Sequence, residues 1–257
     1  MDWNLLIRLF GWRAALIHGD TLVVDRWRWL KMRLPRARDQ SRLIDVGCGT
    51  GGFTFGAAKQ GYHALGLSWD ERNQRIARSR AALSGTNLAL FDVLDVRLLH
   101  TRADLKGKFD VAVLCEVIEH VINDERLVRD TANCLRPGGV LLLTTPNGNY
   151  KPITKEDEGP FIAEETGWHV RKGYHAEDLR KLAECAGLTV QEVSFCSGFL
   201  SQKITGLFRL LSRVHPVISW AVILPLRILP PLLDDYFSRV IKWPEYSICM
   251  VAKKSFE

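Results

Sequence analysis

From residue 43 onward the chain alternates short apolar runs with amphipathic stretches, and this alternation limits its fold more than any other feature. Such a pattern is typical of a parallel β-sheet whose strands are joined by crossover helices. Strands are predicted at 43–46, 63–67, 88–91, 110–114, 140–144, 188–195 and 247–252. Helices are predicted at 53–60, 71–83, 124–135 and 176–186, with a turn at 136–139 before the fifth strand. We therefore expect an α/β fold with a seven-stranded, mostly parallel sheet and helices on both faces.

Two segments fall outside this alternation. Residues 146–167 are polar and carry five acidic side chains, and they are expected to form a lid or substrate loop. Residues 196–245 are rich in Leu, Ile, Val and Pro, which predicts an apolar helical cap inserted before the last strand. The chain then divides into an N-terminal amphipathic helical segment (1–42), a core (43–195), the cap (196–245), and the last strand with the C-terminus (246–257).

The charge is unevenly distributed. The chain has 35 Lys and Arg against 29 Asp and Glu, a net charge of +6. By segment the net charge is +5 for residues 1–42, −3 for 43–197 and +4 for 198–257. Both ends are therefore basic around a mildly acidic middle, which makes a nucleic-acid partner unlikely. With 47% hydrophobic residues, the chain is not expected to be disordered.

Cysteine spacing and hydropathy indicate the compartment. The six cysteines are far apart and form no C-x-x-C pair, so a reducing cytosol is expected. The N-terminus lacks the order of a signal peptide. The longest uncharged run, 214–226, has thirteen residues with two prolines, and about 20 apolar residues are needed to span a bilayer. We predict no transmembrane helix and a cytoplasmic location.

A glycine-rich loop follows the first predicted strand in the segment LIDVGCGTGG (43–52). Glycines there permit a tight turn and let a ligand approach the backbone at a helix N-terminus. Gly47, Gly49 and Gly52 match the dinucleotide pattern G-x-G-x-x-G. Asp45 with Gly47, Gly49 and Gly51 instead matches the D-x-G-x-G-x-G pattern of a different nucleotide site. A purely structural turn is the third interpretation.

The following residues resemble the class I S-adenosylmethionine-dependent methyltransferases, from residue 43 to about residue 193. Besides the glycine loop, the resemblance rests on FDVAVLCEVIEH (109–120), LRPGG (135–139), TTPN (144–147), HVR (169–171) and AGL (186–188). Their order and spacing are similar to a subgroup that includes the ubiquinone-pathway O-methyltransferases and the small-RNA 2′-O-methyltransferases. The resemblance implies a Rossmann-like fold and S-adenosyl-L-methionine as the cofactor.

In this family the glycine loop holds the methionine and ribose parts of the cofactor, and an acid at the end of the third strand binds the adenine amino group. The resemblance implies that Asp92, followed by Val93, takes that last role. The second strand usually ends in an acid that binds the ribose, but here Ser68 stands at that place. Asp70 could replace it, or Ser68 and Asn73 could share the ribose. The structural alternative is that Asp70 only caps the next helix. The predicted cofactor-binding residues are Asp45, Gly47, Gly49, Gly51, Ser68, Asp70, Asn73, Asp92, Val93 and Cys115.

Two carboxylates and an imidazole, Glu116, Glu119 and His120, follow directly on the fourth strand, where open α/β sheets hold their ligands. With His169 they could bind a divalent cation such as Mg²⁺. In the similar members of the subgroup the matching residues bind magnesium or a similar ion, and the resemblance implies the same here. The other interpretations are substrate contact or general base catalysis, and a structural role. A hydroxyl acceptor must lose its proton, and His120 and His169 are the candidate bases.

The N-terminus interleaves tryptophans with arginines, which suits the headgroup region of a bilayer. Together with the apolar residues 204–233, this pattern predicts peripheral membrane attachment or capture of a lipid-linked substrate. The alternative is that the N-terminal helix packs over the cofactor and the cap covers the active site or a second subunit. The tryptophans concerned are Trp3, Trp12, Trp27 and Trp29.

We predict an S-adenosylmethionine-dependent methyltransferase that methylates a hydroxyl oxygen of a small-molecule, sugar or lipid-linked acceptor. Three alternatives remain open: a nicotinamide-dependent oxidoreductase, a non-catalytic membrane-surface binding module on the same fold, and a small-RNA methyltransferase. The sequence does not specify the acceptor or the oligomeric state. The predicted catalytic residues are Glu116, Glu119, His120 and His169.

Overall fold

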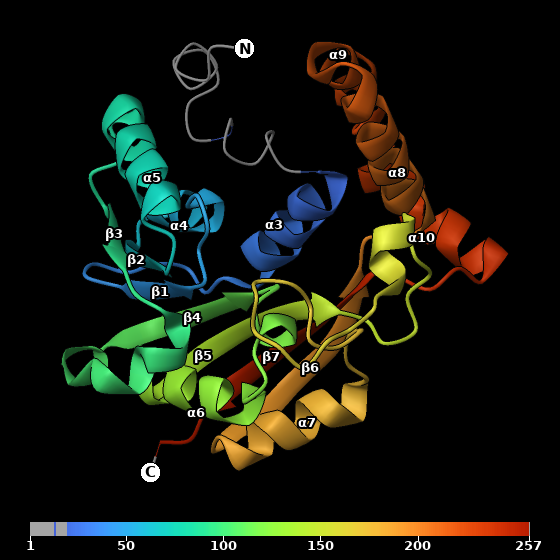
Figure 1. The fold of residues 1–257 in the computed structure, drawn as a ribbon. Helices are drawn as coiled ribbons and strands as arrows, with labels where there is room; N and C mark the ends of the chain where they lie inside the picture. Colours follow the sequence, from blue (N-terminus) through green and yellow to red (C-terminus); the bar gives the residue numbers. More distant parts are fainter. Residues whose placement is uncertain (1–12, 14–19, 257) are drawn as a thin grey trace.

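The structure is a computed structural model that describes residue 13 and residues 20–256. Its centre is a seven-stranded sheet with the strand order β3-β2-β1-β4-β5-β7-β6 (Figure 1). The pairs among β1 to β5 are parallel, and β7 runs antiparallel between β5 and β6. The predicted Rossmann-like α/β fold is confirmed. The strands are β1 (Arg42–Val46), β2 (His63–Ser68), β3 (Ala89–Val93), β4 (Phe109–Cys115), β5 (Leu135–Pro146), β6 (Leu188–Cys196) and β7 (Ser247–Lys254).

Helices cover both faces of the sheet (Figure 1). One face packs against α3 (Thr21–Arg33), α4 (Gly52–Lys59) and α5 (Glu71–Ser84), and its apolar cluster includes Trp27, Phe55 and Leu142. The other packs against α6 (Asp124–Cys134) and α7 (Ala176–Cys185), with Leu127 and Leu179 fully buried. The near-continuous apolar strands follow from this, because both faces of the sheet are buried.

The turn predicted at 136–139 is wrong. Strand β5 already begins at Leu135, which pairs with Phe109 of β4, and the register then shifts so that Val140 pairs with Val111. Gly138 has a φ of +75°, which a glycine adopts without strain. Residues 136–139 therefore form a bulge within β5, and the strand continues on both sides of it.

Helix α3 is held against the sheet by its tryptophans. Trp27 is buried on α4, where a Cβ on Gly56 would lie 2.1 Å from the indole ring. The Trp29 indole N–H donates to Ser194 Oγ of β6 at 2.9 Å. These two tryptophans are core residues, so the prediction that they face a membrane is wrong. Trp3 and Trp12, with most of the predicted N-terminal amphipathic segment, lie outside the described residues.

Three helices lie between β6 and β7, within the segment predicted to be a cap: α8 (Phe199–Val214), α9 (Pro216–Leu226) and α10 (Pro230–Ile241). In Figure 1, α8 and α9 project away from the sheet. In the part of the chain that the structure describes, no single helix has both the length and the apolar character to cross a bilayer. Helices α9 and α10 meet that test only as a pair, and the pair is bent by 78°.

Candidate active site

Two cavities meet at the carboxyl end of β4. The first, which we call the glycine-loop cavity, has a volume of about 350 Å³, and the second, the outer cavity, has about 530 Å³. Both are lined by Glu116 and His120, which follow β4. The carboxyl ends of parallel strands are the usual ligand position in open α/β sheets. The two cavities therefore share a wall at the place where the sequence predicts the site.

Gly47 and Gly49 line the glycine-loop cavity. Gly47 has a φ of +85°, and a Cβ there would lie 2.4 Å from a methyl group of Val117, so only glycine fits. A Cβ on Gly49 would meet no protein atom within 4 Å, because this glycine borders open space. Gly51 caps the N-terminus of α4 and is not part of the lining. The loop thus presents backbone rather than side chains to the cavity.

Ser68 and Asn73 both line the glycine-loop cavity, whereas Asp70 does not. The Asp70 carboxylate accepts a hydrogen bond from the Arg72 backbone N–H at 2.8 Å and caps α5. These contacts lower the pKa of Asp70, chiefly through the hydrogen bond from the Arg72 side chain. The sequence left open whether Asp70 binds the ribose or caps the helix. In the structure Asp70 is the N-terminal cap of α5.

Asp92, predicted to bind the adenine amino group, is not in the lining of the glycine-loop cavity. Its carboxylate pairs with the Arg102 guanidinium at 2.7 Å. Asp95, three residues later, lies in the lining together with Val96. The sequence placed the acid directly after a strand predicted to end at residue 91, whereas β3 continues to Val93 and the chain reaches the cavity only beyond that point.

Three further predicted cofactor residues lie beside the cavity rather than in its lining. Asp45 is buried under the loop and accepts a hydrogen bond from Thr54 Oγ1 at 2.6 Å, and its burial raises its pKa to about 6. Cys115 is buried, and burial raises the pKa of its thiol well above the usual value. Val93 is partly exposed at the end of β3. Asp45 and Cys115 therefore support the cavity from behind.

The loop predicted to be a lid closes one side of the glycine-loop cavity. Glu165 of this loop pairs with Arg97 at 2.6 Å and accepts a hydrogen bond from the Ile122 backbone N–H at 2.7 Å. Thr166 and Gly167, which follow Glu165, line the cavity. This ion pair therefore fixes the loop across the cavity mouth.

Glu116 has an unusual backbone and a buried cationic partner. Its φ is +53°, a left-handed conformation that is uncommon in a residue with a side chain and is often found at functional sites. Its carboxylate lies 2.8 Å from the Arg26 guanidinium of α3 and accepts a hydrogen bond from Thr144 Oγ1 at 3.0 Å. Burial raises the pKa of Glu116, and the positive charge of Arg26 opposes that rise. No local sequence pattern marks Arg26 as part of the site.

Glu119, His120 and His169 form a compact cluster. Each offers a ligand atom within 4.8 Å of the others, and the two imidazole rings lie edge to face with centroids 4.6 Å apart. Glu119 Oε1 and His120 Nδ1 are buried without a hydrogen-bond partner. Glu116, predicted to bind the metal together with Glu119 and His120, is not part of this cluster and pairs with Arg26 instead.

Burial determines the protonation states of the cluster. It raises the pKa of Glu119 well above its usual value, and the charge of nearby Glu116 adds to the rise. Burial lowers the pKa of His120, and burial together with the charge of His120 lowers the pKa of His169 to about 4. Near neutral pH the two imidazoles are therefore uncharged and each has a nitrogen that can accept a proton.

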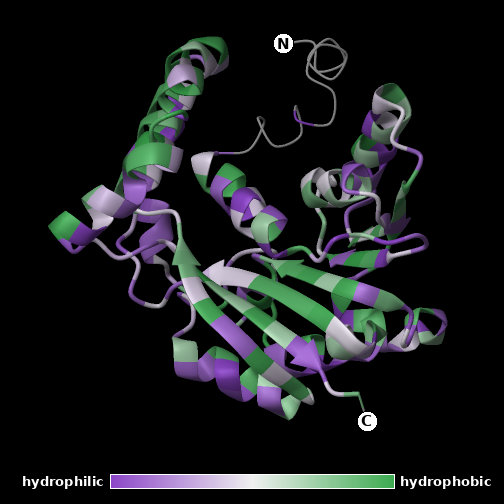
Figure 2. Cartoon of the chain, turned by 180° about the vertical axis from the view of Figure 1, so that it is seen from behind, coloured by the Kyte–Doolittle hydropathy of each residue, from purple (hydrophilic) through white to green (hydrophobic). Residues whose placement is uncertain are grey.

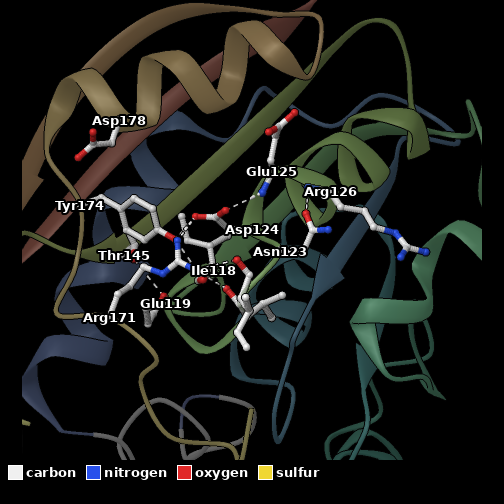
Figure 3. A network of polar contacts seen from close by, with 12 residues as sticks. Ile118, Glu119, Asn123, Asp124, Glu125, Arg126, Thr145, Arg171, Tyr174 and Asp178 are labelled. Carbon is white, nitrogen blue, oxygen red and sulfur yellow. Dashed lines mark hydrogen bonds and ion pairs between the residues drawn. The ribbon is translucent and has the colours of Figure 1, made fainter. Parts of the chain in front are cut away.

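A network of polar contacts positions the cluster (Figure 3). Arg171 pairs with Asp124 and donates to the backbone carbonyls of Val121 and Ile122 at 2.9 Å. The Tyr174 hydroxyl donates to the same Asp124 carboxylate at 2.6 Å. These contacts join the segment that carries His169 to the short 3₁₀ helix η3 (Ile118–His120).

The outer cavity draws its walls from distant parts of the chain. Arg26 of α3 and Tyr246, just before β7, lie on one side, and His169 and Trp168 come from the loop before α7. Helix α8 contributes Phe208, Arg209, Ser212 and Arg213. Because charged, aromatic and imidazole groups converge there beside Glu119, the outer cavity can hold a polar molecule with an apolar part.

A family model described as a methyltransferase domain matches residues 23–193. The ubiquinone biosynthesis O-methyltransferase of Sinorhizobium fredii is 32% identical over 158 residues, which cover 59% of this chain and 61% of that protein. The protein of the same name from Coxiella burnetii is 28% identical over 156 residues, covering 59% and 65%. The chain thus spans less than two thirds of the length of these curated relatives.

Solved structures with low sequence identity share the fold. The geranyl diphosphate C-methyltransferase of Streptomyces coelicolor A3(2), in complex with Mg²⁺, geranyl diphosphate and S-adenosyl-L-homocysteine, superposes with a TM-score of 0.60 at 16% identity. That match covers 89% of this chain and 76% of the other. The [4+2]-cyclase SpnF superposes with a TM-score of 0.61 at 20% identity, covering 90% and 82%.

Proposed function

We propose that this chain, which belongs to the methyltransferase domain family, transfers the methyl group of S-adenosyl-L-methionine to a hydroxyl oxygen of a small-molecule acceptor. The observation that carries the proposal is the wall shared by the two cavities at Glu116 and His120. A transfer between two bound molecules requires them to meet at one point in a fixed orientation. The glycine-loop cavity suits the cofactor, and the outer cavity suits the acceptor.

The glycine-loop cavity fits the cofactor by size and chemistry. Its volume of about 350 Å³ lies within the range of small-molecule sites, roughly 300–1,000 Å³. The open space at Gly49 allows a ligand to approach the backbone closely. Ser68 and Asn73 offer hydrogen-bonding groups for the ribose, and Asp95 offers a carboxylate for the adenine amino group.

When bound, S-adenosyl-L-methionine supplies an electrophilic methyl group on a positively charged sulfur. The oxygen of the acceptor forms the new bond to carbon, the carbon–sulfur bond breaks with its electrons moving to sulfur, and the hydroxyl proton must leave. We assign that proton to the neutral imidazole of His120, with His169 beside it as a second acceptor. Arg26 keeps the Glu116 carboxylate fixed at the shared wall.

A divalent cation is a second way to activate the acceptor. Glu119, His120 and His169 supply one carboxylate and two imidazoles, a donor set that fits transition metals better than Mg²⁺. Glu119 Oε1, which lies 3.9 Å from His120 Nε2, and His120 Nδ1 are buried without a hydrogen bond, which is consistent with such an ion. It would lower the pKa of the acceptor hydroxyl. Because the same nitrogen atoms would bind the metal or take the proton, the two roles are alternatives.

For the acceptor we propose a hydroxyl attached to an apolar, lipid-linked group, on a protein that is cytoplasmic and peripheral to a membrane. The support is the name of the relatives, ubiquinone biosynthesis O-methyltransferases, and the apolar helices α8–α10 beside the outer cavity. The oxygen acceptor is thereby favoured over carbon or nitrogen.

The proposal is tested by calorimetric titration with S-adenosyl-L-homocysteine and with a reduced nicotinamide dinucleotide. We expect roughly micromolar affinity for the first, about −8 kcal/mol, and no heat from the second. In a methyl-transfer assay with radiolabelled cofactor and a series of phenolic acceptors, His120→Ala should lower kcat at least a hundredfold with the homocysteine affinity retained. An equal loss of kcat and of affinity for S-adenosyl-L-homocysteine would assign His120 a structural role. A native protein that does not bind S-adenosyl-L-homocysteine would overturn the proposal.

The same assay separates the base from the metal. Metal content measured on the purified protein, and activity after chelation and re-addition of Mg²⁺, Mn²⁺ or Zn²⁺, are the readouts. Full activity in a metal-free sample assigns His120 as the base, whereas activity restored by one of these ions assigns the cluster to that cation.

A further inference from the structure

The surface of α8–α10 carries many exposed apolar side chains. On α9 alone, Val217, Ile218, Val222 and Leu224 are each 41–53% exposed. Seen from behind, α8 and α9 form a largely hydrophobic projection (Figure 2). So many exposed large apolar side chains on neighbouring helices indicate a site of contact with a partner or a membrane. The exposed large apolar residues of the three helices and of the turn between α9 and α10 are Leu207, Leu210, Val214, Val217, Ile218, Val222, Leu224, Ile228, Leu229, Leu232, Leu233, Tyr236, Val240 and Ile241.

The inner side of the same helices is mostly polar. Of their nine buried residues six are polar, and Ile204, Ile223 and Pro230 are apolar, whereas a water-soluble helix buries mainly apolar residues. Asp234 and Ser238 of α10 are buried and accept hydrogen bonds from the backbone N–H groups of Gly198, Phe199 and Leu200 at the start of α8. Ser219 of α9 is fully buried and donates to the Phe208 carbonyl at 3.1 Å. Polar groups thus join the helices to one another, while apolar groups face outward. This arrangement fits apolar surroundings.

The charges around this surface are mostly positive. From Phe199 to Ile241 the chain contains five Lys and Arg and two Asp. One of the two acids, Asp234, is buried as the cap of α8, which leaves Asp235 as the exposed one. Of the five cations, Lys203 and Arg239 are exposed, Arg213 is exposed and pairs with Glu156 at 2.8 Å, and Arg227 is buried. A basic and apolar surface is complementary to an anionic lipid bilayer.

The helices are too short to cross a bilayer. Helix α9 has 11 residues, about 16 Å of helix, against a hydrocarbon core of about 30 Å. The 78° bend between α9 and α10 prevents them from acting as one straight segment. A short, bent, apolar pair flanked by basic residues suits the plane of the bilayer interface rather than a spanning position.

We propose that the outer surface of α8–α10 lies in the interface of an anionic lipid bilayer and that the outer cavity opens toward lipid at this place. Helix α8 joins the two: Phe208, Arg209 and Ser212 line the outer cavity, whereas Leu210 and Val214 of the same helix are exposed. An acceptor with a lipid tail would reach the cavity without leaving the bilayer. This second part rests on the proposed methyl transfer, but the contact with lipid does not.

Flotation of the purified protein with vesicles tests the proposal. The vesicles are pure phosphatidylcholine, or phosphatidylcholine mixed with phosphatidylglycerol. We compare the native protein with Ile218→Glu/Val222→Glu on α9 and with the control Ile76→Glu/Leu83→Glu, which adds the same charge at exposed apolar positions of α5. The native protein and the control should float with the anionic vesicles. The fraction of the α9 variant bound to these vesicles should be roughly tenfold smaller than that of the native protein.

Three results would overturn the proposal: a native protein that does not float, an α9 variant that floats as well as the native protein, and a control that loses binding equally. A native dimer that the α9 variant converts to a monomer in analytical ultracentrifugation, without flotation, would assign the surface to a second copy of the chain. Circular dichroism and S-adenosyl-L-homocysteine titration on all three proteins check folding. Flotation without homocysteine binding would reject the proposed function and leave the lipid contact standing.

Discussion

Ser68, Asp70 and Asn73 illustrate how one residue's side chain is assigned by its local partners. Asp70 stands two positions beyond the usual ribose acid, and an extended chain would point it the same way as Ser68. The chain instead turns into α5 directly after Asp70, and the first N–H groups of that helix bind its carboxylate. The hydroxyl and amide of Ser68 and Asn73 are then the groups that face the cavity.

Substitution separates these two roles. We expect Asp70→Ala to lower the midpoint of thermal unfolding by a few degrees, because α5 loses its cap, with the affinity for S-adenosyl-L-homocysteine nearly unchanged. Asn73→Ala should do the reverse and weaken that affinity roughly tenfold, because a buried ligand hydroxyl would lose its partner. Differential scanning fluorimetry and calorimetry give the two readouts. A large loss of affinity for S-adenosyl-L-homocysteine in Asp70→Ala would instead indicate that Asp70 binds the ribose.

At the scale of elements, the short helix η3 depends on contacts with another segment of the chain for its position. The helix η3 has three residues and makes few hydrogen bonds of its own, yet it carries Glu119 and His120. Arg171 donates hydrogen bonds to the backbone carbonyls of Val121 and Ile122, which directly follow η3. The Val170 N–H donates to the Glu119 carbonyl at 2.8 Å. The position of the imidazoles therefore depends on the segment after the lid loop.

Arg171→Met should loosen η3 and the segment that carries His169 while the sheet remains intact. We expect faster hydrogen–deuterium exchange at residues 118–123 and 167–173, and a fall of at least tenfold in methyl transfer with a change of less than about threefold in cofactor affinity. Arg180→Met is the matched control, since Arg180 makes only a surface ion pair with Glu177. Unchanged exchange in Arg171→Met would contradict the positioning role.

At the scale of the whole molecule, two buried carboxyls connect stability to pH. Asp45 lies under the glycine loop, and Asp25 of α3 is buried beside Ser201 of α8 and Asp234 of α10. Burial raises the pKa of each to about 6 from 3.8. The folded protein therefore holds these two protons more tightly than the unfolded chain. Each group contributes most below about pH 4, and that contribution is lost as the pH rises to about 6.

The loss is about 3 kcal/mol for each carboxyl, from roughly two pKa units at 1.36 kcal/mol per unit. We expect Asp45→Asn and Asp25→Asn to raise the unfolding free energy at pH 7.5 relative to the native protein, with little gain at pH 4. Asp39→Asn, at an exposed position, should follow the native curve. Urea unfolding at several pH values is the measurement. If the unfolding free energies of the native protein and both variants change with pH in the same way, the pKa values of these two carboxyls are not raised by folding.

Local periodicity explains what the sequence determined by itself. The seven strands and the helices between them were predictable because apolar spacing and helix caps act over a few residues. The glycine loop and the residues from Glu116 to His120 were placed correctly beside the ends of β1 and β4, because a loop after a parallel strand has one end of the sheet to occupy.

The tertiary structure alone decided which side chains meet. Arg26 pairs with Glu116, 90 positions away, and Arg171 pairs with Asp124, 47 positions away. The position of β3's end decides that Asp95 lines the cavity and Asp92 does not. The burial of Trp27 and Trp29 depends on the helices and strands they contact. Periodicity gives the face of a residue within its own element, but its partner belongs to another element. That partner is fixed only when the elements pack together.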